Sequence, residues 1–178
     1  MNGQNLTGDI VNNGISVASG HNLTINGGNG TVSGFATAFN VVTGGTLTLQ
    51  NISFSNNTTD VANAGNLYIG GKVDMQTLTD TGITEIQSGA ELNLSGDYSA
   101  TQTFQGDGTL NFKGNASVAV TKLGTATDNL AVTVAESKNL NLTGTGTLNS
   151  SISGAGKVNI ASGNTIQTDA NNLQADVI

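Results

Sequence analysis

Residues 44–49 read GGTLTL, and six-residue segments of the same kind recur along the chain. Each has a small or polar first residue, two further residues, and then two apolar residues on either side of a polar one. The copies are GHNLTI (20–25), GGTLTL (44–49), AGNLYI (64–69), GAELNL (89–94), DGTLNF (107–112), SKNLNL (137–142) and AGKVNI (155–160). Because neighbouring side chains of a strand point to opposite faces, this alternation predicts short strands with one apolar face.

The first apolar residues of the seven copies are separated by unequal intervals. They serve as register marks for the repeat: Leu23, Leu47, Leu67, Leu92, Leu110, Leu140 and Val158. An irregular interval suits a β-solenoid, whose turns can lengthen outward, and suits an α-solenoid badly. The sequence therefore predicts an all-β, right-handed parallel β-helix of about eight coils, on the order of 40 Å long. A β-sandwich is the main alternative, because it also has many short strands.

The composition supports ordered strands. The chain of 178 residues contains 25 Gly, 25 Thr and 24 Asn, and only 10% of its residues are charged, which would also fit disorder. However, 36% of the residues are hydrophobic, and they occur in short alternating runs that predict the other strands of each coil. These runs lie at 15–17, 31–32, 41–42, 52–54, 83–86, 118–120, 130–134 and 152, and Gly and Asn at 26–30, 70–71, 106–108 and 144–146 predict the corners.

Charge and cysteine content exclude several classes of function. The net charge is −7, all five basic residues are Lys, and nucleic acid is therefore not an expected partner. The chain has no Cys, so disulfides and thiolate metal sites are excluded. No stretch approaches the roughly 20 apolar residues of a membrane span, and residues 1–10 lack the features of a signal peptide. We expect residues 1–178 to form a single β-solenoid segment of a longer repetitive surface protein.

These repeats resemble the pectin-lyase-like right-handed β-helices, in particular the passenger regions of autotransporters and of filamentous-haemagglutinin-like surface adhesins. The segment GGTLTLQNISFSNN (44–57) is also similar to the GG and FxxN coils of chlamydial polymorphic membrane proteins, with Phe54 and Asn57 in the FxxN positions. The resemblance implies secretion and display on the outer membrane of a Gram-negative bacterium, with a role in adhesion and virulence. It also requires that a polysaccharide lyase or hydrolase be considered.

The residues needed for such enzymatic chemistry are not grouped in the sequence. Lyases of this kind use an Arg or Lys base beside an Asp-bound Ca²⁺, and hydrolases use clustered carboxylates. The chain has no Arg, and its nine Asp residues occur singly, although carboxylates such as Asp97 and Asp107 could still meet across coils. His21 is the only His, GGNGTV (27–32) has Val32 where a Ca²⁺-binding nonapeptide has Asp, and GDGTL (106–110) reads as a corner. We therefore expect no enzymatic activity, no catalytic residues, no cofactor and no metal.

The expected partners are host or neighbouring-cell surface molecules, or other copies of the chain joined through open solenoid ends. The two longest intervals between motif copies, Leu67 to Leu92 and Leu110 to Leu140, predict protruding contact loops at Lys72–Asp80 and Lys122–Asn129. The tail DANNLQADVI (169–178) could cover or join an end. Ice binding is disfavoured, because only one predicted outward pair is Thr-x-Thr: Asn22/Thr24, Thr46/Thr48, Asn66/Tyr68, Glu91/Asn93, Thr109/Asn111, Asn139/Asn141 and Lys157/Asn159.

Overall fold

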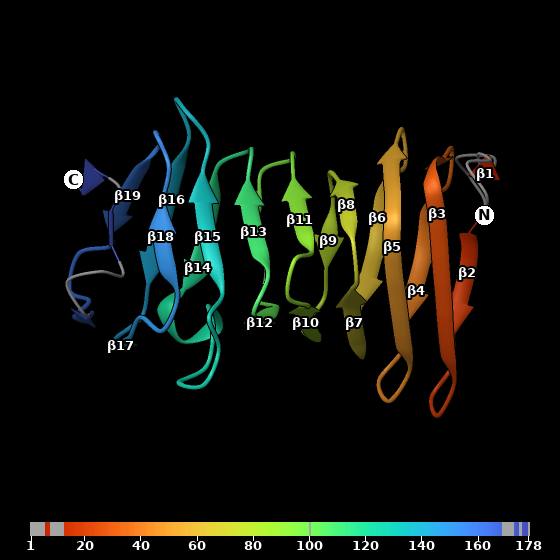
Figure 1. Cartoon of the computed structure of the whole chain (residues 1–178), viewed down its shortest axis with the longest axis horizontal. Helices are drawn as coiled ribbons and strands as arrows, with labels where there is room; N and C mark the ends of the chain where they lie inside the picture. The colour runs from red at the N-terminus through yellow and green to blue at the C-terminus, as the bar shows by residue number, and fades with distance from the viewer. Residues whose placement is uncertain (1–5, 8–12, 100, 169–172, 175, 178) are drawn as a thin grey trace.

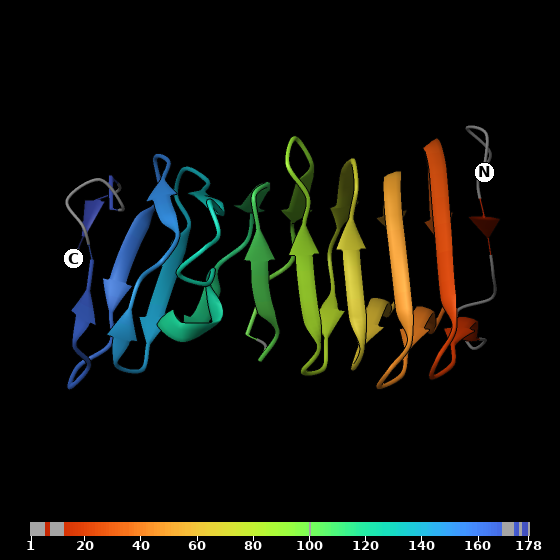
Figure 2. The ribbon, with the colours of Figure 1, turned by 60° about the horizontal axis from the view of Figure 1, so that its bottom comes forward.

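The computed structural model describes residues 6–7, 13–99, 101–168, 173–174 and 176–177, and it is a parallel β-solenoid of about eight turns. The structure is 57% strand and 2% helix, so the predicted all-β fold is confirmed. The coils stack along one long axis, with the two chain ends at opposite ends of the rod (Figures 1 and 2). In Figure 1 the chain advances from right to left. The near strands β3 (Asn22–Ser33) and β5 (Thr46–Ser55) run upward, and β2 (Asn13–Val17) and β4 (Thr37–Val41) run downward behind them, so the coil is right-handed.

Three columns of parallel strands form the walls. The first column contains residues 22–26 of β3 (Asn22–Ser33), residues 46–50 of β5 (Thr46–Ser55), β7 (Asn66–Ile69), β10 (Ile83–Ile86) and β12 (Thr103–Gly106). The second contains β1 (Leu6–Thr7), the later halves of β3 and β5, β8 (Lys72–Met75), β11 (Glu91–Leu94), β13 (Thr109–Phe112), β15 (Ala131–Val134) and β18 (Ser151–Ser153). Since β3 and β5 run through both columns, these strands form one 11-stranded sheet.

The third column is divided between two sheets. One contains β2 (Asn13–Val17), β4 (Thr37–Val41), β6 (Thr59–Asn63) and β9 (Leu78–Thr79). The other contains β14 (Ala116–Ala119), β16 (Asn139–Thr143), β19 (Lys157–Ile160) and β21 (Asp176–Val177). The remaining described elements are the 3-10 turn η1 (Val120–Lys122) and the paired strands β17 (Gly146–Thr147) and β20 (Ile166–Gln167).

The apolar side chains of each column stack on those of the next coil. In the second column the inner positions hold buried aliphatic side chains in register from coil to coil: Ile52, Val73, Leu92, Leu110, Val132 and Ile152. Each strand supplies only two or three inward side chains, so a single coil cannot bury them by itself. The stack of coils therefore provides one continuous core along the rod.

The motif copies are not register marks for a single column, so this part of the sequence interpretation is wrong. Leu23, Leu47 and Leu67 stack in the first column, Leu92 and Leu110 in the second, and Leu140 and Val158 in the third. The two longest intervals in the sequence are the two places where the motif moves to the next column. The reason is physical: every half-buried strand of a coil requires the same alternation, whichever column it occupies.

Aromatic side chains fill the middle of the core. Tyr98, Phe104 and Phe112 come from different strands and corners of successive coils, and their ring centroids lie 5.4 to 6.3 Å apart. Phe39 and Phe54 meet edge to face at 5.9 Å nearer the N-terminal end. Burial raises the pKa of the Tyr98 hydroxyl well above its ordinary value, an effect that a contact with the Gln102 backbone only partly offsets. The phenol therefore stays neutral and acts as a core residue.

The corner that follows β5 is held by Asn57 and Asp60. Asn57 accepts a hydrogen bond from the Phe35 amide (2.9 Å) and donates to the Val32 carbonyl (3.1 Å) and to Asp60 Oδ1 (2.8 Å). Asp60 is fully buried, and its other oxygen accepts from the amides of Gln76 (2.6 Å) and Thr77 (3.0 Å). Asn57 thus joins its own coil to the preceding one, and Asp60 joins it to the following one. This gives the Phe54-x-x-Asn57 segment a structural explanation.

The predicted corner at 26–30 is a bulge. Asn26 pairs with Gln50 and Gly30 pairs with Ile52, so β3 contains two more residues than β5 at this place. Gly28 and Asn29 adopt φ values of 55° and 66°, the left-handed region that Gly and Asn tolerate best. The segment GGNGTV is therefore a turn in β3, as the sequence indicated.

Candidate functional surface

A row of polar side chains follows the outer face of the second column. From β5 to β15 the middle residue of each strand in this column lies between two inward apolar residues, and in β3 and β18 it lies between one inward apolar residue and a glycine. In all of these strands it therefore points away from the core. We call this row the polar ladder, and its members are Thr31, Ser53, Asp74, Asn93, Asn111, Thr133 and Ser153. The ladder therefore crosses seven successive coils at the strand spacing of about 4.8 Å.

Hydrogen bonds join neighbouring members of the ladder. Asn111 Nδ2 donates to Asn93 Oδ1 at 2.9 Å, and the Thr133 hydroxyl donates to Asn111 Oδ1. Ser53 donates to Asp74 Oδ2 at 3.4 Å. The third column has a similar pair, in which Asn159 Nδ2 donates to Asn141 Oδ1 at 2.7 Å. These bonds orient the side chains that they join.

Two lysines lie over the middle of the polar ladder. Lys72 Nζ is 3.8 Å from Asp74 Oδ2, and Lys113 Nζ is 4.0 Å from Asp74 Oδ1. Asn93 occupies the rung between Asp74 and Asn111, and only 4% of it is exposed. All three charged side chains are substantially exposed, so these ion pairs contribute little stability. They instead determine the charge that a partner of the ladder would meet.

Replacing Asn111 with alanine is expected to lower the free energy of unfolding by about 1 kcal/mol, because the side chain both donates to Asn93 and accepts from Thr133. Urea denaturation followed by circular dichroism measures the change. Thr109→Ala, on the same strand, is the control and is expected to change stability by less than about 0.5 kcal/mol. Equal effects of the two substitutions would contradict a stabilising role for the ladder.

The outer row of the first column is chemically mixed. Its members are Thr24, Thr48, Tyr68, Glu85 and Gln105. Thr24 and Thr48 are adjacent, but Tyr68 and Glu85 follow, and Gln105 donates to Glu85 at 3.3 Å. The described strands of this column therefore present no regular threonine array, as the sequence indicated.

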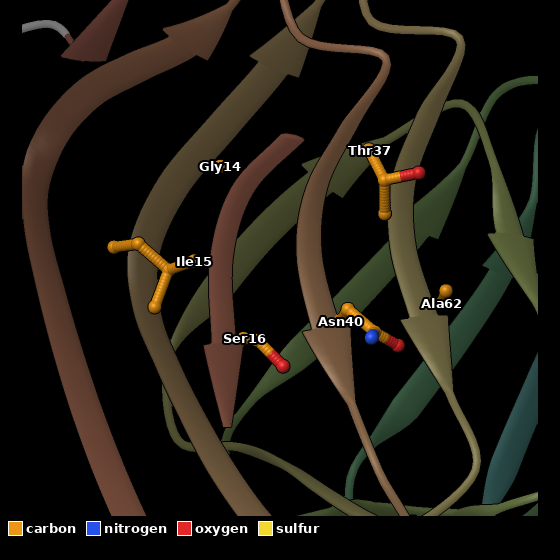
Figure 3. Close-up of a pocket in the computed structure, with 6 residues that line it drawn as sticks. All are labelled: Gly14, Ile15, Ser16, Thr37, Asn40 and Ala62. Atoms are coloured by element: carbon orange, nitrogen blue, oxygen red, sulfur yellow. The ribbon is translucent and has the colours of Figure 1, made fainter. Parts of the chain in front are cut away.

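A shallow hollow of about 290 Å³ lies on the outer face of the third column near the N-terminal end. Figure 3 shows the six labelled residues that line it, which come from β2, β4 and the adjoining β6: Gly14, Ile15, Ser16, Thr37, Asn40 and Ala62. Most of these residues are small, and none of these described lining residues has an ionisable side chain. They form a concave surface of mixed polarity and supply no group suited to acid–base chemistry.

One of the two predicted contact loops, Lys122–Asn129, is a loop in part, because Lys122 ends η1 and Leu123 is buried and bridges to Phe104. Residues 125–129 lie outside the strands, and the loop is ordered by Asp128, whose carboxylate accepts from the Thr125 amide at 2.8 Å. The prediction for Lys72–Asp80 is wrong, because this segment contains β8 and β9 and buries Val73, Met75 and Leu78. The long interval between motif copies there reflects the change of column and not an insertion.

The two Asp residues considered for catalysis are corner residues. Asp97 Oδ1 accepts from the Asn115 amide at 2.9 Å, and Asp107 Oδ1 accepts from the Asn129 amide at 2.9 Å. His21 is exposed, with Nδ1 3.0 Å from the Ser19 carbonyl oxygen. In the described part of the chain, no three acidic or His side chains come together in a way that could hold a metal ion. Asp9 and Asp169 lie outside the described residues.

Sequence reasoning missed the polar ladder as a unit. Its members follow apolar residues in the pattern of a strand, but the sequence does not show which strands are neighbours. A usable signal is the polar residue that separates paired apolar residues at 52–54, 73–75, 92–94, 110–112 and 132–134. These segments follow one another at nearly even intervals, so they form a more regular series than the seven motif copies.

No protein-family model matches the sequence, and no curated protein matches it either. Among the helices of the described residues, none is long and apolar enough to cross a membrane. The functional argument therefore depends on the surface of the solenoid.

Proposed function

We propose that this chain is a non-enzymatic structural and adhesive segment of a secreted or surface-displayed bacterial protein. The pectin-lyase-like passenger regions of autotransporters, displayed at a Gram-negative outer membrane, are the group that its repeats resemble. The observation that carries the proposal is the polar ladder, an outer row of hydrogen-bonding side chains in register on seven coils of one uninterrupted sheet.

Such a surface suits adhesion through many similar weak contacts along the ladder. Most rungs present one hydroxyl or amide side chain, Asp74 presents a carboxylate, and some neighbouring rungs share hydrogen bonds, so a contact with a single rung is weak. A long partner that meets several rungs at once gains from the high effective concentration of each further contact. The partner expected on these grounds is an extended polar molecule on a host or neighbouring cell.

Binding of the fluorescently labelled chain to glycan arrays and to cultured cells tests this proposal. Ser53→Glu, Thr133→Glu and Ser153→Glu, combined in one variant, place carboxylates along the ladder and are expected to weaken binding at least tenfold. The matched control changes Thr24, Thr48 and Gln105 to Glu on the outer row of the first column, with the same change in net charge. Equal loss in both variants, or no binding by the unaltered chain, would contradict adhesion through the ladder.

End-to-end association is a second candidate, supported by two residues at opposite ends of the rod. Ile15 and Ile160 are each 37% exposed, although they pair with Phe39 and Leu142, which are fully buried. Both are therefore core positions that are only partly covered: Ile15 lies in the first described strand of the third column, and β21 pairs with Lys157 and Val158 of β19 but not with Ile160. A further coil would bury apolar surface at either place. Residues 1–5, 169–172, 175 and 178 lie outside the described residues, and with them most of the tail predicted to cover or join an end.

Light scattering over a range of concentrations measures association. If the ends join, the mass is expected to rise with concentration, and Ile15→Asp is expected to keep the chain monomeric. Thr48→Asp, on an outer face, is the control. A constant monomer mass up to high concentration would contradict this second candidate.

A further inference from the structure

The third column is interrupted once along the described rod. Strand pairing joins β2 to β4, β4 to β6 and β6 to β9, and it resumes where Tyr98 bridges to Ala116 ahead of β14 and β16. Among the described residues, no pairing joins β9 to residues 97–99 of the next coil. The other two columns cross the same boundary intact, through β7 with β10 and β8 with β11. The break therefore affects one wall of three.

A hollow of about 380 Å³ lies at this break. Its described lining comes from both sides of the boundary: Thr77, Leu78, Thr79 and Asp80 from one coil, and Asp97, Tyr98, Ser99 and Thr101 from the next. A direct bond across the break is the one from the Thr101 hydroxyl to the Asp80 carbonyl, at 3.4 Å. The two coils are thus held only weakly at the outer surface of this wall.

Gln102 takes the place of a glycine at the corner beside the break. The first-column positions Thr46, Asn66, Ile83 and Thr103 are in register, so the residues before them are equivalent: Gly45, Gly65, Gly82 and Gln102. A Cβ at any of the three glycines would lie 2.5 to 2.6 Å from a backbone oxygen of the preceding coil. Of these four corners only the one at Gln102 holds a long side chain, and the equivalent residue one coil before Gly45, His21, is exposed.

The Gln102 side chain is fully buried and bonds to two earlier coils. Its Nε2 donates to the carbonyl of Asn63 at 2.9 Å and to that of Thr79 at 2.6 Å. Its Oε1 accepts from Asn63 Nδ2 at 3.0 Å and from the Thr84 hydroxyl at 3.2 Å. Asn63 and Thr84 are also fully buried. The side-chain amide of Gln102 therefore links the coil of β12 to the coil of β6 and passes β9, the strand that has no partner in the next coil.

We propose that the break is a hinge within the solenoid and that Gln102 is the clamp that holds it closed. The continuous first and second columns form the side about which the two halves bend. The third column is the side that opens, because among the described hydrogen bonds only those of Gln102 and Thr101 resist separation there. Loss of the clamp exposes the edge of β9 and allows the rod to bend, which changes the alignment of any surface that extends over both halves.

Hydrogen exchange measured by mass spectrometry tests the clamp. Gln102→Leu keeps the size of the side chain but removes all four bonds, and it is expected to raise the exchange rate of amides in residues 76–82 and 95–99 at least tenfold. Gln105→Leu is the matched control, because Gln105 lies on the outer face and donates to Glu85 within the intact first column. Exchange in β4, β16 and β19 is expected to be unchanged in both variants. An equal rise along the whole rod, or no rise near the break, would overturn the proposal.

Spin-label distances test the hinge. The chain has no Cys, so labels at introduced cysteines are unique. Asn40→Cys with Ser117→Cys spans the break on the third column, and Ser53→Cys with Thr133→Cys spans the same boundary on the second. Both pairs are four coils apart, about 19 Å along the axis. Gln102→Leu is expected to broaden the distance distribution of the first pair only, and equal distributions in both pairs would overturn the hinge.

If Gln102→Leu fails to fold, Thr84→Val provides the test. This substitution preserves the shape of the side chain and removes one of the four bonds. It is expected to give a smaller rise in exchange, of about threefold, confined to the same two segments. A rise elsewhere, or none, would count against the clamp.

Discussion

Phe104→Ala is expected to lower the free energy of unfolding by about 3–5 kcal/mol, the largest effect of the substitutions considered. Phe104 is fully buried, and its ring lies 5.4 Å from that of Tyr98 and 6.3 Å from that of Phe112. Truncation removes apolar surface and leaves a cavity that neighbouring coils cannot close, because the ladder between β10 and β12 and the bridge from Phe104 to Leu123 hold the backbone in place. The loss is therefore expected at the upper end of the usual range.

Urea denaturation at 25 °C, followed by far-ultraviolet circular dichroism, measures this change. Tyr68→Ala is the control, since Tyr68 is an aromatic residue on the outer face of the first column. It is expected to cost less than about 1 kcal/mol, because its ring lies on the outer face, is only partly buried and leaves no enclosed cavity when it is removed. A loss of stability as large as that of Phe104→Ala would contradict the assignment of the inner and outer faces.

Asp60→Ala is expected to cost about 3 kcal/mol, because its carboxylate accepts hydrogen bonds at a fully buried place. The donors are the amides of Gln76 and Thr77 and the side chain of Asn57, and alanine leaves all three without this acceptor. Leaving one buried donor without an acceptor costs about 1–3 kcal/mol of stability, and water that enters the corner offsets part of this loss. The corner would then no longer join three successive coils.

The same denaturation experiment tests Asp60, with Asp74→Ala as the matched control. Asp74 is half-exposed, and its contacts with Lys72 and Lys113 are 3.8 and 4.0 Å long. Its loss is expected to cost less than about 0.5 kcal/mol. Asp60→Asn keeps one acceptor oxygen and is expected to fall between the two. Similar values for Asp60→Ala and Asp74→Ala would contradict the structural role of Asp60.

The adhesive role and the hinge are separable. If the ladder variant loses binding while Gln102→Leu leaves amide hydrogen exchange near the break unchanged, the adhesive proposal is supported and the hinge proposal is contradicted. If hydrogen exchange near the break rises as expected and no partner binds the ladder, the hinge proposal is supported and the adhesive proposal is contradicted. If both hold, bending at the break determines how many rungs on the two halves one straight partner can meet.

The sequence alone determined the fold class. The alternation in segments such as GGTLTL and GAELNL, with Gly and Asn between them, predicts short strands that bury one face, and their recurrence along the whole chain favours stacked coils over a β-sandwich. The structure confirms the all-β solenoid of about eight turns and the change of direction predicted at 26–30, which is a bulge in β3, while the loop predicted at Lys122–Asn129 is a loop after Leu123. These features depend on local patterns, which a sequence displays directly.

Only the tertiary structure decided which strands are neighbours. Leu67 and Leu92 belong to identical motifs but lie in different columns, because alternation fixes the face of a side chain and not its partner strand. For the same reason the polar ladder, the corner held by Asp60 and the break beside Gln102 could not be predicted. Each depends on residues one or two coils apart that meet only when the coils stack, so the pairing register creates the surface that we propose for function.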